Sequence, residues 1–115
     1  MPTSEPAYAP GDVVVVPFPY SDRFAEKRRP ALVVSNEAVR AQGFVWVVMI
    51  TSAAHRKTPH DLPIEDLALA GLGAPSLVRP IKIACLEPLR IIRKAGRLGD
   101  RQTAAVADAI RSFIG

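Results

Sequence analysis

The stretch that decides the fold is Lys27-Arg28-Arg29-Pro30-Ala31-Leu32-Val33-Val34-Ser35, in which three cations run into a proline and then into an apolar, β-branched segment. Residues 31–35 predict a short buried strand, because valine packs well on a pleated surface. Pro30 has no N–H to donate to a sheet, so we expect it at the first residue of the strand or at a sheet edge. Arg29 is then expected at the mouth of the strand, where a rigid backbone directs its guanidinium group.

Short apolar segments separated by proline and glycine continue on both sides of this stretch. They predict further strands at 13–18, 44–51, 62–64, 76–79, 81–86 and 89–92, with polar loops at 20–29 and 52–61. Asn36 can cap a short helical turn through residue 42. Ile81, Ile83 and Cys85 alternate with the residues between them, so we expect one face of that strand to be buried.

The chain ends in a predicted helix with Asp100 as N-cap, and its apolar side chains fall on one stripe: Val106, Ile110, Phe113 and Ile114. Many short strands and one closing helix are typical of a mainly β fold with a strongly bent sheet or a small barrel. Residues 1–10 hold three prolines and no periodicity, which predicts a flexible N-terminal arm. We expect residues 11–115 to form a single domain.

The bulk composition narrows the class of protein. The chain has 115 residues and a formal charge of +4, which favours an anionic partner without proving one. Cys85 is the one cysteine, so neither an intramolecular disulfide nor a cysteine-based zinc site can form, as is typical of a reducing compartment. No apolar run approaches the roughly 20 residues of a membrane span, and the N-terminus lacks a signal-peptide pattern. We therefore expect a cytoplasmic protein without a membrane partner.

Three motifs occur in order along the chain: Gly11-Asp12-Val13-Val14, Arg29-Pro30-Ala31-Leu32-Val33 and Ile50-Thr51-Ser52. Together, over residues 10–115, they resemble the MazF/PemK-like toxins of type II toxin–antitoxin systems. The resemblance implies an SH3-like small barrel with a C-terminal helix, the MazF/PemK/CcdB-type toxin fold, in a homodimer. It also implies a sequence-specific endoribonuclease that cleaves single-stranded RNA without a metal or other cofactor and is inhibited by a cognate acidic antitoxin.

The resemblance places the family's catalytic arginine and threonine at Arg29 and Thr51. RNA carries its own nucleophile, the 2′-OH, and its attack on the neighbouring phosphorus gives a 2′,3′-cyclic phosphate and a 5′-OH end. Arginine suits the charge that builds on the phosphate oxygens, because its planar group pairs with two of them and stays protonated. Thr51 can donate its hydroxyl to the same phosphate. Without the resemblance, both residues would read as ordinary strand-end side chains.

Further basic and polar residues of the two loops and neighbouring strands are candidate RNA contacts, because phosphate contacts supply most non-specific affinity. They are Arg23, Lys27, Arg28, Ser52, Arg56, Lys57 and Arg79. Each could equally be a solvated surface residue. His55 and His60 invite a role in proton transfer. We expect neither to be catalytic, since loop histidines are mostly idle and the resembling family does not use them.

Two other functions remain open from the residues. One is a CcdB-like toxin that poisons DNA gyrase, which needs no arginine–threonine pair and uses its C-terminal helix end. The other is a non-catalytic SH3-like module that binds nucleic acid or protein.

Overall fold

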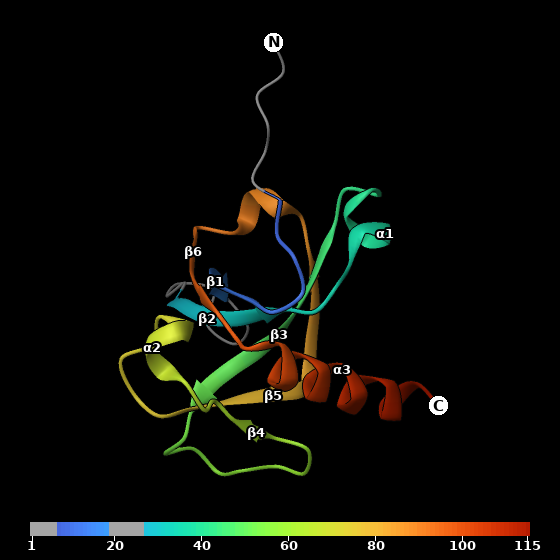
Figure 1. The fold of residues 1–115 in the computed structure, drawn as a ribbon. Coiled ribbons are helices and arrows are strands. Elements are labelled where there is room, and N and C mark those ends of the chain that lie inside the picture. Colours follow the sequence, from blue (N-terminus) through green and yellow to red (C-terminus); the bar gives the residue numbers. More distant parts are fainter. Residues whose placement is uncertain (1–6, 19–26) are drawn as a thin grey trace.

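The computed structural model describes residues 7–18 and 27–115, which form a curled six-stranded antiparallel sheet with a long C-terminal helix (Figure 1). The strand order is β4-β5-β3-β2-β1-β6. The strands are β1 (Asp12–Phe18), β2 (Lys27–Val33), β3 (Val45–Ser52), β4 (Leu62–Pro63), β5 (Ser76–Leu86) and β6 (Arg93–Arg97). The helices are α1 (Glu37–Arg40), α2 (Leu67–Ala70) and α3 (Asp100–Ile114), and residues Pro88–Arg90 form a 3-10 turn. The predicted mainly β fold with a closing helix is confirmed.

The sheet buries apolar side chains on both faces, which fits its almost unbroken apolar strands. On one face, strand residues such as Leu32, Val48 and Val78 pack with Val106 of α3 and Ala70 of α2. The other face carries a second core, made chiefly of these strand residues: Val14, Val16, Ala31, Val33, Val45, Val47 and Met49. The far half of β5 and the segment before β6 cover this second core through Ala84, Leu86 and Ile91. The sheet therefore curls around its own second face, as a small barrel does.

Pro30 lies inside β2 rather than at its first residue, so that part of the sequence prediction is wrong. It nevertheless marks the place where β2 stops pairing with β3, since the last paired residues are Ala31 and Met49. Val34 N–H donates to Trp46 O at 2.9 Å, and alternate residues of an antiparallel strand point their N–H groups the same way. Pro30 lies four residues before Val34, so its nitrogen also faces β3, but it has no proton to donate. Pro30 therefore supplies no donor for the next ladder bond, and the described residues of β2 and β3 form no pair beyond Ala31 and Met49. We call these unpaired strand ends the open fork.

Strand β5 is continuous, although two pieces separated by Pro80 were expected. Val48 pairs with Ile83 and Met49 with Arg79, so residues 80–82 have no partner in β3. This bulge accommodates the proline without the loss of a ladder bond.

The predicted strand at 89–92 is wrong, because Pro88 begins a 3-10 turn and the last strand starts only at Arg93.

The predicted buried face of Ile81, Ile83 and Cys85 is also wrong. Ile81 is 55% exposed and Ile83 47%, and Cys85 is exposed as well. Trp46, which lies opposite Cys85 in β3, is 43% exposed. Alternation gives the period of a strand but not which of its faces is covered. Here α3 packs on other residues of the same face. The start of β3 and the end of β5 therefore carry uncovered apolar side chains, which we call the apolar patch (Trp46, Ile81 and Ile83).

Helix α3 is attached to the sheet by polar and apolar contacts. Gly99 is the N-cap of α3 and Asp100 its first helical residue, so the helix begins one residue earlier than predicted from Asp100 as the cap. The buried Gln102 accepts a hydrogen bond from Glu65 N–H and donates to Pro63 O, which ties α3 to β4. Val106 is fully buried as predicted, whereas Phe113 and Ile114 are exposed. No helix in the described ranges is both long and apolar enough to cross a membrane.

The predicted N-terminal arm lies mostly outside the described residues, since residues 1–6 are not among them. Tyr8 packs against the second core, and Ala9 N–H donates to the buried Asp12 carboxylate at 2.9 Å. The flexibility of the arm stays a prediction.

Candidate functional site

Arg29 and Thr51 lie just beyond the point where β2 and β3 stop pairing. The last pair is Ala31 and Met49, and Arg29 and Thr51 each come two residues after it along their own strands. Because alternate residues of a strand share a face, Arg29 lies on the face of Ala31 and Thr51 on the face of Met49, which is the same face of the sheet. Arg29 is exposed and Thr51 half-buried, and the open fork at Pro30 separates their strands.

Three cations gather at the first residues of β2. Lys27, Arg28 and Arg29 are consecutive, exposed residues of this strand. Among residues 7–18 and 27–115, none of the three forms an ion pair. Guanidinium and hydroxyl groups can both bind the oxygens of a phosphate group.

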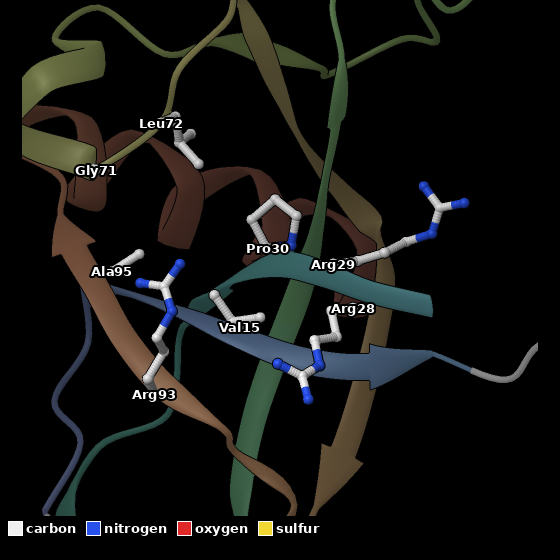
Figure 2. A pocket seen from close by; sticks show the side chains of 8 residues that line it. All are labelled: Val15, Arg28, Arg29, Pro30, Gly71, Leu72, Arg93 and Ala95. Atoms are coloured by element: carbon white, nitrogen blue, oxygen red, sulfur yellow. The ribbon is translucent and has the colours of Figure 1, made fainter. Parts of the chain in front are cut away.

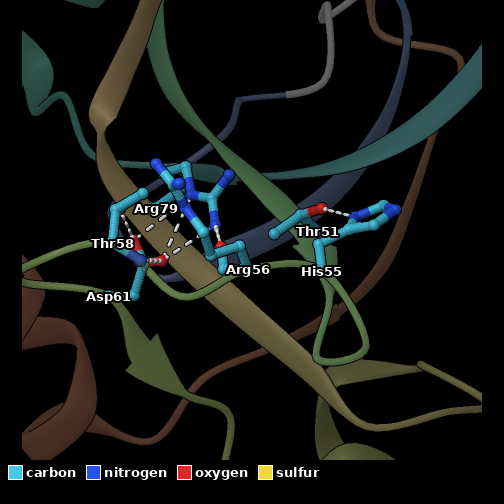
Figure 3. A network of polar contacts seen from close by, with 6 residues as sticks. All are labelled: Thr51, His55, Arg56, Thr58, Asp61 and Arg79. Atoms are coloured by element: carbon cyan, nitrogen blue, oxygen red, sulfur yellow. Dashed lines mark hydrogen bonds and ion pairs between the residues drawn. The ribbon is translucent and has the colours of Figure 1, made fainter.

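His55 is a member of the site that the sequence analysis set aside. Its Nδ1 lies 2.7 Å from Thr51 Oγ1, as Figure 3 shows. A tight turn makes this contact possible: His55 N–H donates to Ser52 O at 3.0 Å, and Ala54 N–H donates to Ser52 Oγ at 3.1 Å. Ser52 after a strand is a turn signal, and a turn would have brought position 55 back over position 51.

A buried ion pair holds the rest of this loop. Arg79 Nη2 lies 2.9 Å from Asp61 Oδ2 and also donates to Arg56 O at 2.7 Å (Figure 3). Thr58 donates to the same carboxylate from its backbone and its hydroxyl. The Asp61 side chain is fully buried and that of Arg79 is 15% exposed. Three loop residues and Arg79 of β5 therefore share one carboxylate-centred network, which we call the Asp61 clamp (Arg56, Thr58, Asp61 and Arg79).

The clamp favours the charged form of its carboxylate. Burial by itself raises the pKa of Asp61, but the hydrogen bonds from Arg79 and Thr58 outweigh it and hold this pKa below its ordinary value. Arg79, a predicted RNA contact, donates from Nε to Asp61 and from Nη2 to Arg56 O, so these two groups are engaged inside the protein. Its contact with RNA stays a prediction, and the structure gives it a role in fixing the loop.

A pocket of about 280 Å³ opens on the other side of β2. Figure 2 shows Arg93 and Arg28 on either side of Val15, while Arg29 leaves β2 in another direction. The sheet register explains the grouping, since Val15 pairs with Pro30 on one side and with Arg93 on the other. The lining residues are Val15, Arg28, Arg29, Pro30, Gly71, Leu72, Arg93 and Ala95. An apolar floor with a basic rim fits a ligand that is both flat and anionic, such as a nucleotide.

Arg93 is thus a second residue that the sequence analysis missed, because the strand that carries it was expected four residues earlier. Among the other predicted contacts, Ser52, Arg56 and Lys57 are exposed in the loop that follows Thr51. Arg23 lies outside the described residues. His60 has a left-handed backbone with φ of 74°, and its ring meets the edge of Phe113 at 5.0 Å rather than the site. In the described part of the chain, no three His, Cys, Asp or Glu side chains gather closely enough to hold a metal ion.

Comparison with known families decides what this arrangement belongs to. The model of the PemK-like, MazF-like toxins of type II toxin–antitoxin systems matches residues 9–114, nearly the whole chain. The chain is a member of this toxin family. The predicted resemblance to MazF/PemK-like toxins is confirmed, and the elements that carry Arg29 and Thr51 both lie inside the matched region. No curated protein sequence matches this MazF-like chain significantly.

Solved structures agree with the family assignment. The Mycobacterium tuberculosis toxin MazF-mt6 is similar at a TM-score of 0.70 and 26% identity, over 90% of this chain and 95% of that one. An endoribonuclease in complex with its cognate antitoxin, from a mycobacterial species, is similar at 0.76 and 20% identity, over 95% and 96% of the two chains. A MazE–MazF complex from Deinococcus radiodurans is similar at 0.69 and 22% identity, over 97% and 98%. At these identities the last two show a shared fold.

Proposed function

We propose that this MazF-like toxin is an endoribonuclease that cleaves single-stranded RNA through the RNA's own 2′-OH. Three things support the proposal: the family, the endoribonuclease among the proteins of similar fold, and the site itself. The single observation that carries it is that Arg29 and Thr51 each lie two residues beyond the last β2–β3 pair, on the face that carries Ala31 and Met49.

The chemistry follows from these two side chains. Attack of the 2′-oxygen on phosphorus builds negative charge on the non-bridging oxygens, and fixed donors that face those oxygens stabilise the transition state. Arg29 supplies a permanent cation with two parallel N–H groups, and Thr51 a hydroxyl on a stiff β-branched side chain. The 2′-O–P bond forms as the P–O5′ bond breaks, and overall one proton passes from the 2′-oxygen to the leaving 5′-oxygen. The products therefore end in a 2′,3′-cyclic phosphate and begin with a 5′-OH. No step requires a nucleophile from the protein or a metal ion.

The basic residues around this pair are proposed to hold the neighbouring nucleotides. Arg28 and Arg93 line the pocket on the opposite side of β2, which is large enough for part of a nucleotide and has Val15 and Pro30 as an apolar floor. Lys27, Arg56 and Lys57 extend the positive surface on the strand and loop beside Thr51. Such contacts raise affinity for any single strand and weaken with salt.

The same surface suits an acidic antitoxin. Two of the proteins of similar fold are solved as complexes with an antitoxin, one of them a MazE–MazF pair. A negatively charged segment lying over Lys27, Arg28 and Arg29 would occupy the positions that RNA phosphates need. Inhibition would then be a competition for the same cations.

A homodimer is proposed on the uncovered apolar patch of β3 and β5. Trp46, Ile81 and Ile83 are each more than 40% exposed there, and Phe113 and Ile114 add apolar surface at the end of α3. Exposed apolar side chains gathered on neighbouring strands mark an interaction surface more often than isolated ones do. Analytical ultracentrifugation of the protein and of Ile83→Lys tests this, since a charge in the patch should shift a dimer to monomer.

The deciding experiment incubates the purified protein with a long, unstructured RNA in EDTA and sequences the ends of the fragments. We expect cleavage at specific sites, cyclic phosphate ends and no cleavage of the corresponding DNA. Fragments with 5′-phosphates, or cleavage only with Mg²⁺, would point to an activated-water mechanism instead. An intact RNA together with inhibited gyrase supercoiling would support the gyrase-poisoning function, and neither effect would support a binding module.

A further inference from the structure

We propose that His55 is a positioning residue that keeps the Thr51 hydroxyl proton directed at the scissile phosphate. The inference rests on the proposed function and adds to it a residue to which the catalytic pair is coupled. It starts from one distance, 2.7 Å between His55 Nδ1 and Thr51 Oγ1, which is a short and well-formed hydrogen bond.

The direction of this hydrogen bond decides what Thr51 can do. A hydroxyl has one proton, so it cannot donate to the imidazole and to a phosphate at the same time. If Nδ1 is bare, Thr51 donates to the ring and meets the phosphate with lone pairs only, which repels negative charge. If Nδ1 carries the proton, the ring donates to Oγ1 and the hydroxyl proton is free for a phosphate oxygen. An anion bound at Oγ1 favours the second arrangement, because it attracts the additional donor.

The loop holds His55 firmly enough for such a role. On the side toward the strand, the turn from Ser52 fixes the His55 backbone through its N–H at 3.0 Å. On the other side, the carbonyl of Arg56 accepts from Arg79 Nη2 at 2.7 Å, so the residue directly after His55 is attached to the Asp61 clamp. The backbone that carries the imidazole is therefore fixed at His55 itself and at the next residue, which keeps the ring within reach of Thr51.

The first test is a double-mutant cycle in single-turnover cleavage, with enzyme in excess over an RNA that carries one cleavage site. His55→Ala should lower the cleavage rate about tenfold or more. The loss should stay smaller than the roughly 10²-fold loss expected for Thr51→Ala, because His55→Ala misorients the hydroxyl donor and does not remove it. The enzyme concentration at half-saturation should stay within twofold of wild type. In a Thr51→Ala background, His55→Ala should have no further effect, since its whole contribution passes through Thr51.

The second test uses the shape of the replacement. Asparagine places an amide N–H where Nδ1 lies, whereas glutamine places its amide near the position of Nε2. His55→Asn should therefore retain most of the cleavage rate, and His55→Gln should behave like His55→Ala. His60→Asn is the matched control: asparagine tolerates its left-handed backbone, and the ring contacts Phe113 rather than Thr51, so cleavage should be unchanged.

Several outcomes would overturn the inference. Cleavage at the wild-type rate in a folded His55→Ala variant removes the role altogether, and a loss that multiplies with that of Thr51→Ala shows that His55 acts on RNA directly. A ¹⁵N spectrum of the imidazole gives a readout without RNA, and a bare Nδ1 in the presence of inorganic phosphate would contradict the proposed direction. If the wild-type protein leaves RNA intact, the proposed function fails first and takes this inference with it.

Discussion

Two arginines in this chain precede prolines on strands of the same sheet, and they have opposite surroundings. Arg29 is exposed at the open fork of β2, and the described residues give it no carboxylate partner. Arg79 in β5 is mostly buried and spends its donors on Asp61 and on the carbonyl of Arg56. Both side chains lie on the face of the sheet that carries Met49 and Thr51. Within the described residues, the difference separates an exposed arginine without a carboxylate partner from one that fixes the loop beside it.

The largest effect should come from the buried arginine. Arg79→Ala leaves the Asp61 carboxylate buried without its ion-pair partner, and breaking such a pair typically costs about 3–5 kcal/mol of unfolding free energy. Urea denaturation measures the change. The double variant Arg79→Ala/Asp61→Ala should be less destabilised than Arg79→Ala alone, because it removes the stranded charge. Equal stability of Arg79→Ala and wild type would mean that the clamp contributes nothing to folding.

The exposed arginine should affect activity in place of stability. Arg29→Ala and Thr51→Ala should each lower RNA cleavage by about 10²-fold or more, while their unfolding free energies stay within about 0.5 kcal/mol of wild type. The double variant should lose less than the product of the two, because both residues act on one phosphate. A folded single variant that cleaves at the wild-type rate would show that the replaced residue is not catalytic.

The third expectation concerns acid. Because the pKa of Asp61 is lowered in the folded protein, its contribution to stability is fully present above the ordinary aspartate pKa of about 3.9 and is lost as the pH falls through the folded value. Urea midpoints measured from neutral pH into strong acid should fall for the wild type in that range. Asp61→Asn cannot ionise, so its midpoint should start lower and fall less. Parallel curves would assign the acid response to other carboxylates.

The contrast between these two arginines also shows what the sequence could provide. Strand positions around Pro30 and Thr51 follow from short apolar runs, and the family motifs by themselves indicated Arg29 and Thr51. The burial and ion pairing of Arg79 could not be predicted in this way. They depend on how loop residues 52–61 pack on β5 and bring Asp61 to Arg79. His55 differs from Arg79 in this respect, because the turn signal at Ser52 already indicated that position 55 could return to Thr51. The exposed face of Ile81 and Ile83 was misassigned because periodicity does not tell which face another element covers.

A smaller effect is expected at the pocket. Arg93→Ala should weaken RNA binding without changing the cleavage rate at saturation, and the slope of log affinity against log salt should become shallower by about 0.7, the value for one lost contact to a single-strand phosphate. Arg97→Ala on the same strand is the matched control, since Arg97 does not line the pocket. Equal slopes for both variants and wild type would remove the pocket from the RNA path.

The smallest expected effect is on the rate at which an antitoxin associates. Lys27→Ala/Arg28→Ala should weaken binding of RNA and of an acidic antitoxin together, and the loss for the antitoxin should lie mainly in its association rate. Charge steering acts over roughly 10 Å at 0.1 M salt, so stopped-flow rates for wild type and variant should converge as salt rises. Normal antitoxin association with poor RNA binding would mean that the inhibitor does not cover this strand, and the apolar patch would be the next surface to test.

The missing proton of Pro30 has a consequence for how this protein trades one property against another. A residue with an N–H at this position could extend the β2–β3 ladder by a bond worth about 0.5–1.5 kcal/mol, so the chain forgoes stability that nearly any other amino acid would supply. In return, the proline ring fixes its own backbone torsion and leaves the next ladder position without a donor. An RNA that enters such an opening meets a gap that needs no unzipping first. Sequences selected only for thermal stability would be expected to replace this proline early.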